Sequence, residues 1–372
     1  MRIVSLTYIN SPDFNQPLDW IGRLYAFTGV LEELSKEHDV FSIEQINYSG
    51  DLVHKGVQYH FRNYGDGVTR FPFQLHKLVK QLQPDIVLVR GLNFPLQVIQ
   101  LRFSLGKKGR IVVENHFDRP PVGIRKKFQQ IAYPCINAYH FISASTATEW
   151  IKSGIIKDQS KCIEIAAGSA RITPGDKNES KLTLGMNGDF NFLWVGSLSP
   201  RKDPMTVING FEKYLRENPL ARLYMIYQTE ELLPVIKNKL DENATLQNAV
   251  FLKGKIPNEE LGIWYSAADF FIMGSHAEGG SIALLEAIAC GCIPVVTAIP
   301  AALGTTLNGE YGFHFEVGDV EGLYQQLLAL SSIDATGFSR KLKKYFQEEL
   351  SFRAIAGKFI DSCKNSPQRA TE

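Results

Sequence analysis

Two glutamates, Glu278 and Glu286, stand eight residues apart, and a glycine pair directly follows the first of them. Gly279 and Gly280 precede an apolar stretch of helical periodicity that begins near Ser281. Glycine lets a backbone approach a ligand closely, and the free N–H groups at the positive end of a helix attract anions. We therefore expect this segment to bind a phosphate group through its backbone.

The two glutamates favour a partner other than phosphate, because carboxylates repel anions. Glu278 lies in the loop, and Glu286 lies about one and a half turns inside the helix. Each carboxylate can accept hydrogen bonds from a pair of neighbouring hydroxyl groups. A nucleotide sugar fits this arrangement, because its phosphates lie between the two diols and would face the N–H groups of Ser281 and Ile282. The alternative is that the glycines only shape a turn and the glutamates are ordinary surface charges.

A pair of cations, Arg201 and Lys202, follows an apolar run that ends at Gly196. Fixed cations in a dry cleft stabilise the negative charge of a leaving nucleoside diphosphate without a metal ion. The alternative is a pair of solvated charges in front of a helix that Asp203 caps and Pro204 begins.

The elements that position these residues follow a pattern that occurs twice along the chain. Short apolar runs rich in Val, Ile and Phe alternate with longer segments of helical periodicity, which is typical of βαβ units and a parallel sheet. The expected strands are Ile3–Tyr8, Val40–Ile43, Asp85–Val89, Arg110–Glu114, His140–Ser143, Cys162–Ile165, Asn191–Val195, Ala221–Tyr227, Val250–Leu252, Asp269–Met273, Pro294–Thr297 and Gly312–Phe315.

A lapse in this pattern predicts the domain boundary. Gly, Ser, Pro, Asn and Asp dominate between Gly168 and Gly188, which is the composition of a linker. We expect a first α/β domain at 1–170, a linker at 171–190 and a second α/β domain at 191–350. A C-terminal helix at 351–372 is expected to pack back on the first domain. Parallel sheets bind ligands at the carboxyl ends of their strands, so the loops there are the expected sites of chemistry.

The segment from Glu278 to Gly291, followed by Ile293-Pro294-Val295-Val296, closely resembles the signature of family 4 glycosyltransferases, the glycosyl transferases group 1. The resemblance implies the GT-B fold, with two Rossmann-like domains whose parallel sheets face a central cleft. In that family the first glutamate binds hydroxyls of the donor sugar and the second binds the ribose. Carried over, these roles fall to Glu278 and Glu286.

The cation pair resembles a second family segment and departs from it at two positions. Family members usually have an Arg after the strand's glycine and a Lys-Gly pair further on, and the two cations hold the diphosphate. Here Ser197 stands in place of that Arg, and Asp203 stands in place of that Gly. The resemblance implies that Lys202 keeps its role, with Arg201 as the candidate for the second cation.

A third segment, Lys253-Gly254-Lys255-Ile256, resembles the family loop whose backbone pairs with the edge of the base. Lys253, Gly254 and Ile256 are the expected base-site residues, with uridine preferred over guanosine. Such contacts are mostly main-chain, and a simple turn before a helix is the alternative.

The first domain matches the family in arrangement more than in residues. His116 and Asp118 resemble a His-Asp segment that faces the donor, so His116 is a candidate for contact with the sugar or a phosphate. A lone His is more often structural. Gly22, Arg23 and Asp118 are weaker candidates for the acceptor side. The glycine-rich loop of the family, where Gly22 and Arg23 lie, retains only one glycine here.

Composition limits the partners. The 372 residues include 40 basic and 39 acidic side chains and carry a net charge of +1, so no global field favours nucleic acid. Five cysteines without framework spacing favour a reducing compartment. The apolar runs are short, which predicts a cytoplasmic protein that at most lies against a membrane. Basic clusters at 107–110 and 119–127 suit an anionic leaflet, or are simply a solvated face.

The family resemblance implies a retaining glycosyltransferase that needs no metal or other cofactor. The resemblance implies transfer of a hexose-type sugar from a nucleoside diphosphate to a glycan, lipid-linked or small-molecule acceptor, in the synthesis of cell-surface polysaccharide or glycoconjugate. A non-catalytic glycosyltransferase-like partner subunit is the alternative, because Ser197 replaces a cation. A phosphorylase or epimerase of the same architecture also remains open. A dinucleotide-dependent oxidoreductase is disfavoured, since residues 5–14 contain no glycine.

Overall fold

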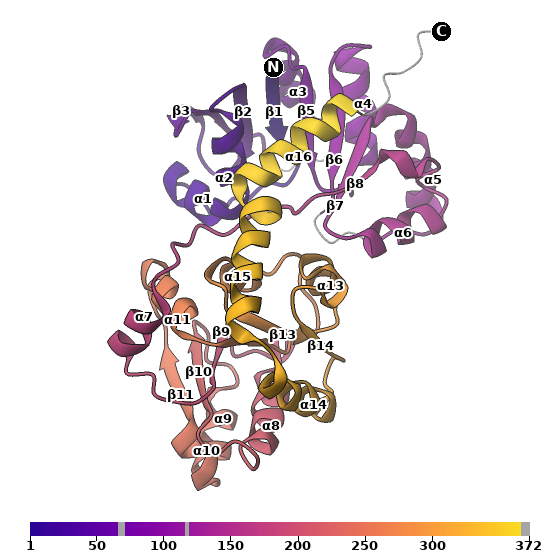
Figure 1. Cartoon of the computed structure of the whole chain (residues 1–372). Coiled ribbons are helices and arrows are strands. Elements are labelled where there is room, and N and C mark those ends of the chain that lie inside the picture. The colour runs from indigo at the N-terminus through magenta and orange to yellow at the C-terminus, as the bar shows by residue number, and fades with distance from the viewer. Residues whose placement is uncertain (66–70, 116–118, 366–372) are drawn as a thin grey trace. The chain divides into compact units, whose positions relative to one another are not determined.

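The computed structural model describes residues 1–65, 71–115 and 119–365. Contacts between residues divide the chain into two compact units, and the colour bar of Figure 1 locates their residue ranges. Unit 1 consists of Met1–Ser169 together with Phe352–Glu372, and unit 2 is Ala170–Ser351. The C-terminal segment thus belongs to the same unit as the N-terminus.

Unit 1 is built on an eight-stranded sheet in the order β3-β4-β2-β1-β5-β6-β7-β8. Within the described residues its pairings are parallel, apart from the antiparallel pair β3–β4. The strands are β1 (Arg2–Leu6), β2 (Asp39–Gln45), β3 (Gly50–His54), β4 (Val57–Arg62), β5 (Ile86–Arg90), β6 (Arg110–Glu114), β7 (Ala138–Phe141) and β8 (Cys162–Glu164).

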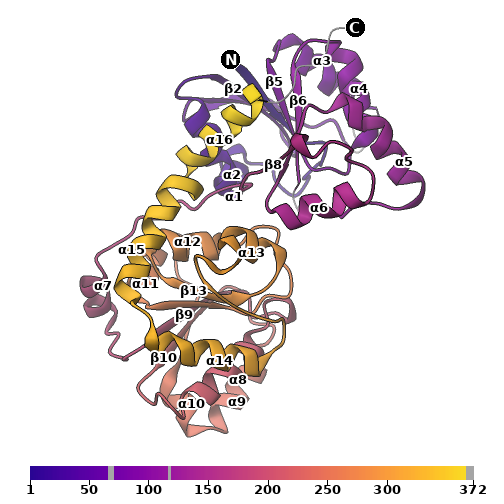
Figure 2. The same cartoon turned by 45° about the vertical axis from the view of Figure 1, so that its right-hand side comes forward.

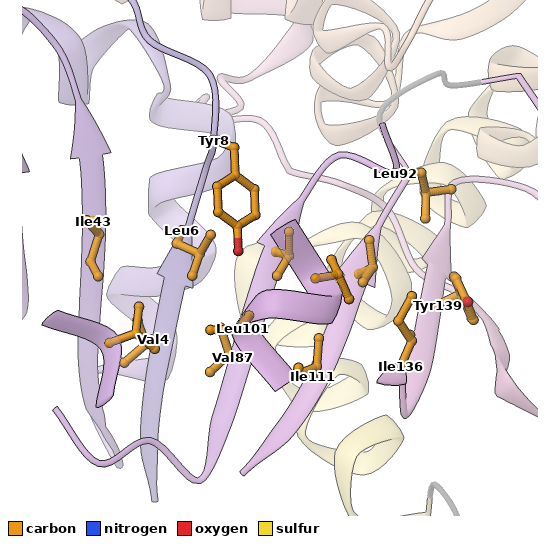
Figure 3. Close-up of a cluster of buried hydrophobic side chains, with 14 of the residues drawn as sticks. Val4, Leu6, Tyr8, Ile43, Val87, Leu92, Leu101, Ile111, Ile136 and Tyr139 are labelled. Carbon is orange, nitrogen blue, oxygen red and sulfur yellow. The ribbon is translucent and has the colours of Figure 1, made fainter. Parts of the chain in front are cut away.

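Two helical layers cover this sheet. The helices are α1 (Pro17–Arg23), α2 (Tyr25–Leu34), α3 (Phe73–Gln81), α4 (Pro95–Leu105), α5 (Gly123–Ala132), α6 (Ala144–Lys152) and α16 (Phe352–Asn365). On one face, α2 and α16 pack together over Ile3 and Leu88. On the other, α3 and α4 cover a second apolar cluster, and Figure 3 shows Leu6, Val87 and Leu101 within it. Because both faces are covered, most residues of the central strands are apolar.

Unit 2 is built on a six-stranded parallel sheet in the order β11-β10-β9-β12-β13-β14. The strands are β9 (Asn191–Gly196), β10 (Arg222–Tyr227), β11 (Val250–Gly254), β12 (Phe270–Met273), β13 (Ile293–Thr297) and β14 (Phe313–Phe315). The helices are α7 (Lys177–Leu184), α8 (Pro204–Tyr214), α9 (Leu233–Asp241), α10 (Ala244–Ala249), α11 (Leu261–Ala267), α12 (Ile282–Cys290), α13 (Pro300–Thr305), α14 (Val320–Ala329) and α15 (Ala335–Tyr345).

The helices of unit 2 also form two layers. Helices α7, α11, α12 and α15 pack in series, while α8 packs against α14. Figure 2 shows α12 and α13 on one side of the sheet and α8 and α14 on the other. The α/β class with two mostly parallel sheets, predicted from the alternating pattern, is thereby confirmed.

Two regions differ from the elements that the sequence predicts. The range 171–190, interpreted as a linker, contains helix α7, which belongs to unit 2 and packs against α11. Asp176 caps this helix by accepting hydrogen bonds from the N–H groups of Asn178 and Glu179. The hairpin β3–β4 was not predicted either, and it turns at Lys55 and Gly56, which both have positive φ.

Candidate active site

Two loops at the carboxyl edge of the unit 2 sheet hold the predicted donor residues. The first connects β9 to α8 and contains a short 3₁₀ helix, η4 (Pro200–Lys202). The second connects β12 to α12. Because β9 and β12 are hydrogen-bonded neighbours, these loops leave the sheet side by side.

Glu278 lies between two cations. Lys202 Nζ is 2.5 Å from Glu278 Oε1, and Arg201 Nη1 is 3.4 Å from Glu278 Oε2. The side chain of Glu278 is only 8% exposed, whereas that of Arg201 is 56% exposed. Arg201 also donates to the carbonyl oxygen of Ala277 at 2.9 Å. A carboxylate that would be costly to bury alone is thus paired, and at least one of its partners can also reach solvent.

The start of α12 is shaped as its sequence predicts. Ser281 is the N-cap, and its Oγ accepts a hydrogen bond from the N–H of Leu284 and donates one to Met273 Sδ. Gly279 and Gly280 are exposed. A Cβ on Gly280 would meet no atom within 4 Å, so the backbone there is open to a ligand. This helix end can therefore accept an anion.

Glu286 lies further along the same helix and is buried. Tyr265 of α11 is its neighbour, and burial together with the charge of Glu286 raises the pKa of the Tyr265 hydroxyl well above its usual value. Tyr265 is therefore protonated at any physiological pH and can act only as a neutral neighbour of the carboxylate. Sequence reasoning missed this residue, because nothing in the spacing links 265 to 286.

The predicted base loop ends the edge strand β11. The pairing with β10 shifts register at Lys253, and Gly254 has a φ of 68°. This bulge turns the Lys253 ammonium over the rings of Tyr224, Phe251 and Trp264, at 5.5 to 5.7 Å from their centroids. Lys253 and the half-buried Ile256 accordingly flank a glycine whose backbone is accessible.

A second contact between the two donor loops involves residues that the sequence did not single out as a site. His276 Nε2 lies 3.0 Å from Asp203 Oδ2, and the N–H of His276 donates to the carbonyl oxygen of Arg201. From the sequence, Asp203 is expected as a helix cap and as a departure from the family's Gly, and His276 is given no role. The available signal was an Asp at a position where the family has Gly.

The structure brings together most of the predicted donor residues at one edge of unit 2. Those gathered around the two loops are Gly196, Ser197, Arg201, Lys202, Glu278, Gly279, Gly280, Ser281, Ile282 and Glu286. Gly22 and Arg23 lie on α1 of unit 1 and are exposed. His116 and Asp118 lie outside the residues that the structure describes.

The carboxyl edge of the unit 1 sheet has a buried ion pair that sequence reasoning also missed. Arg90 Nη2, at the end of β5, lies 2.6 Å from Glu44 Oε1 near the end of β2. Glu44 also accepts hydrogen bonds from Trp20 Nε1 and Ser42 Oγ. The bond from Trp20 fixes α1, the helix of Gly22 and Arg23, against the sheet.

The described residues contain neither a group of metal ligands nor a helix that could span a membrane. Across residues 1–65, 71–115 and 119–365, no three His, Cys, Asp or Glu side chains gather as metal ligands would. In the same ranges no helix has both the length and the apolar content to cross a membrane.

Comparison with known proteins identifies the segment that contains this cluster. Residues 176–349, just under half of the chain, match the family model of "Glycosyl transferases group 1". This segment is a member of that family. The chain is 30% identical over 147 residues to a D-inositol 3-phosphate glycosyltransferase of Frankia alni, covering 36% of this chain and 35% of that protein. It is 28% identical over 174 residues to an Escherichia coli UDP-Gal:alpha-D-GlcNAc-diphosphoundecaprenol alpha-1,3-galactosyltransferase, covering 45% and 43%.

Solved structures extend the likeness of fold to the whole chain. A glycosyltransferase from Rickettsia africae superposes with a TM-score of 0.73 at 16% identity, over 99% of both chains. The Anabaena protein HepE, solved in complex with UDP, superposes with a TM-score of 0.72 at 14% identity, over 98% of this chain and 100% of that one. The GT-B fold that the family resemblance implies is therefore confirmed, with the group 1 segment in unit 2.

Proposed function

We propose that this protein is a glycosyltransferase that moves a hexose from a nucleoside diphosphate to an acceptor, with retention of configuration and without a metal ion. The observation that carries the proposal is the buried carboxylate of Glu278 between Lys202 and Arg201, beside the open N-terminus of α12. A donor needs acceptors for its hydroxyls and cations for its diphosphate, and this cluster offers both.

Each group then has a defined task. Glu278 accepts hydrogen bonds from hydroxyls of the donor sugar, and Glu286 accepts them from the ribose. Lys202 and Arg201 contact the diphosphate together with the N–H groups at the start of α12. When the C–O bond to the sugar breaks, negative charge grows on the diphosphate, and the cations stabilise it without reorganisation. The diphosphate oxygen takes the acceptor proton on the same face of the sugar, which gives retention.

UDP is the proposed nucleotide. The open backbone at Gly254 suits the main-chain edge contacts that a pyrimidine makes. Two named proteins support this choice: HepE has been solved with UDP, and the E. coli relative is named for a UDP-linked galactose.

We propose further that the acceptor is lipid-linked and that the protein works at an anionic membrane surface. Helices α4 and α5 pack side by side and contain no Asp or Glu. Large apolar side chains on and beside them are strongly exposed: Phe103 82%, Val122 85%, Ile124 70% and Ile131 59%. Arg125, Lys126 and Lys127 of α5 add positive charge. Exposed apolar and basic side chains on one helix pair fit a bilayer with anionic headgroups.

The donor site is tested by a thermal-shift panel of UDP-, GDP-, ADP- and dTDP-sugars in the presence of EDTA. A ligand at 100 times its Kd adds about 2.7 kcal/mol of stability, which is easily measured. We expect UDP-sugars alone to stabilise the protein and Glu286→Gln to remove the effect. Glu217→Gln, an exposed site three residues beyond the C-terminal end of α8, is the matched control and keeps the effect. If no nucleotide shifts the transition, the donor site is refuted and a non-catalytic partner subunit is favoured.

A further inference from the structure

Asp203 adopts a backbone conformation that usually belongs to glycine. Its φ is 41° and its ψ is 60°, in the left-handed region. A non-glycine residue is strained there, although Asp tolerates the region better than most. Its side chain makes three contacts in return. Oδ1 accepts from the N–H of Thr206, and Oδ2 accepts from Thr206 Oγ1 and from His276 Nε2.

The contact with His276 is one of several that join the two donor loops. The backbone N–H of His276 donates to Arg201 O at 2.8 Å, and Arg201 Nη1 donates to Ala277 O at 2.9 Å. At the base of the loops, a Cβ on Gly274 would lie 2.8 Å from Asp203 O, so the two backbones are in close contact there. These contacts therefore hold the β9–α8 and β12–α12 loops in a fixed position relative to each other.

The relative position of the two loops determines where the second cation lies. Ser197 is neutral, so Lys202 needs another positive partner for a diphosphate of two negative charges. The guanidinium of Arg201 is the nearest candidate, and it is more than half exposed. Its main chain is bonded to His276 and its side chain to Ala277, the next residue along. His276 in turn is bonded to Asp203, which directly follows the cation pair.

We propose that Asp203 and His276 are positioning residues that direct Arg201 to the donor diphosphate, so that Arg201 replaces the cation missing at Ser197. The inference rests on the proposed function, because it assumes a nucleoside diphosphate in this site. Neither residue touches the donor. His276 anchors the loop that presents Glu278, and Asp203 holds the imidazole from the opposite loop.

The test is a double-mutant cycle on UDP affinity, measured by isothermal titration calorimetry with EDTA present. We expect His276→Ala and Arg201→Ala each to weaken UDP binding about tenfold. The double variant should bind no more weakly than Arg201→Ala alone, because His276 acts through Arg201. His276→Gln places an amide N–H near the position of Nε2 and should restore affinity to within about twofold of wild type.

A matched control comes from unit 1, where His60 and Asp51 form a similar pair at 2.9 Å. His60→Ala removes that pair and should leave UDP affinity unchanged. Hydrogen exchange of the unliganded protein gives a second measurement. Amides of residues 199–206 and 274–281 should exchange faster in His276→Ala than in His276→Gln or wild type.

The results distinguish failure of the positioning role from failure of the proposed function. If wild type binds no nucleoside diphosphate, the proposed function is refuted and the inference is refuted with it. If wild type binds UDP and His276→Ala binds equally well, only the positioning role is refuted. Additive losses in the double variant, or no rescue by His276→Gln, would also overturn it.

Discussion

The carboxyl group of Glu278 lies at a position where only 8% of its side chain is exposed, and Lys202 is its shortest ionic contact. Burial of a charge is costly unless a partner compensates for it, so Lys202 offsets the burial of Glu278 besides its role in the proposed chemistry. The two roles can be separated. Stability requires only that neither partner is left as an unpaired buried charge, whereas donor binding requires the charges of both Lys202 and Glu278.

Lys202→Met should lower the free energy of unfolding by about 2 kcal/mol, because Glu278 is left with only the longer contact to Arg201. Adding Glu278→Gln should recover most of that loss, since neither charge remains. Neither variant should bind a UDP-sugar as wild type does. Urea denaturation followed by circular dichroism measures the stability, and a double variant as unstable as Lys202→Met would contradict this account of the pair.

Single residues differed in how well the sequence could predict them. Glu278 and Glu286 were recognisable because they lie on one continuous segment with a fixed spacing. The contacts of His276 and Tyr265 were not, because each joins two elements that meet only in the folded chain. The Arg90–Glu44 pair could not be predicted for the same reason, because its two residues are 46 positions apart in the sequence.

At the scale of elements, the N-terminus of α12 is the part of the fold that the proposed donor site depends on most. Ser281→Ala removes its cap and should cost about 1 kcal/mol of stability. It should also weaken UDP binding, because the first N–H groups of the helix lose their fixed direction.

Asp176→Ala is the matched control, since it removes the cap of α7 in the same unit. It should cost a similar amount of stability and leave UDP affinity unchanged. Equal effects of both variants on UDP binding would show that the start of α12 has no special role. Chemical denaturation and calorimetry supply the two measurements.

The exposed apolar and basic side chains of helices α4 and α5 should bind an anionic membrane. Wild type should bind vesicles that contain phosphatidylglycerol and should bind phosphatidylcholine vesicles weakly. Reversing the charge of Arg125 and Lys127 should weaken binding about thirtyfold or more, because each of the two basic residues contributes about 1 kcal/mol near an anionic surface. Val122→Ser should weaken it too, whereas Val53→Ser, another strongly exposed apolar site, on β3, should not. Equal binding to both lipids would contradict the membrane proposal.

The strands of both sheets were largely predictable, because buried parallel strands are continuous apolar runs. Helix α7 was not, because Gly and Pro around it outweighed the signal of Asp176 followed by Glu179, the usual start of a capped helix. The β3–β4 hairpin has alternating polar residues and short strands, and its Lys-Gly turn was the one cue to it.

At the scale of the whole molecule, two buried imidazoles in unit 1 link stability to pH. Burial lowers the pKa of His140 to about 4, and burial likewise lowers that of His76 to about 4. In the unfolded chain both titrate near 6.5. As pH falls from about 6.5 to about 4, the unfolded state therefore binds protons that the folded state does not. The stability of unit 1 is fully present above this window and falls within it.

Unit 1 should accordingly lose about 1 to 3 kcal/mol per histidine between pH 7 and pH 4.5. Urea denaturation at a series of pH values measures the loss. His140→Gln keeps a donor for Ser362 Oγ, the hydrogen-bond partner that α16 provides, and should flatten the pH dependence. An unchanged slope in that variant would show that other groups cause it.

Sugar transfer at the Glu278 cluster can be followed by proton NMR of the anomeric signals. The UDP-hexose that binds is incubated with the protein and EDTA, without acceptor, so that water replaces the acceptor. We predict slow consumption of the α-linked donor with the free α anomer appearing first. Glu278→Gln should reduce the rate about a hundredfold or more while UDP still binds, because the proposed donor contacts of that carboxylate are with the sugar and not with the nucleotide. Bound donor that is never consumed, or consumption that Glu278→Gln leaves unchanged, would contradict the account.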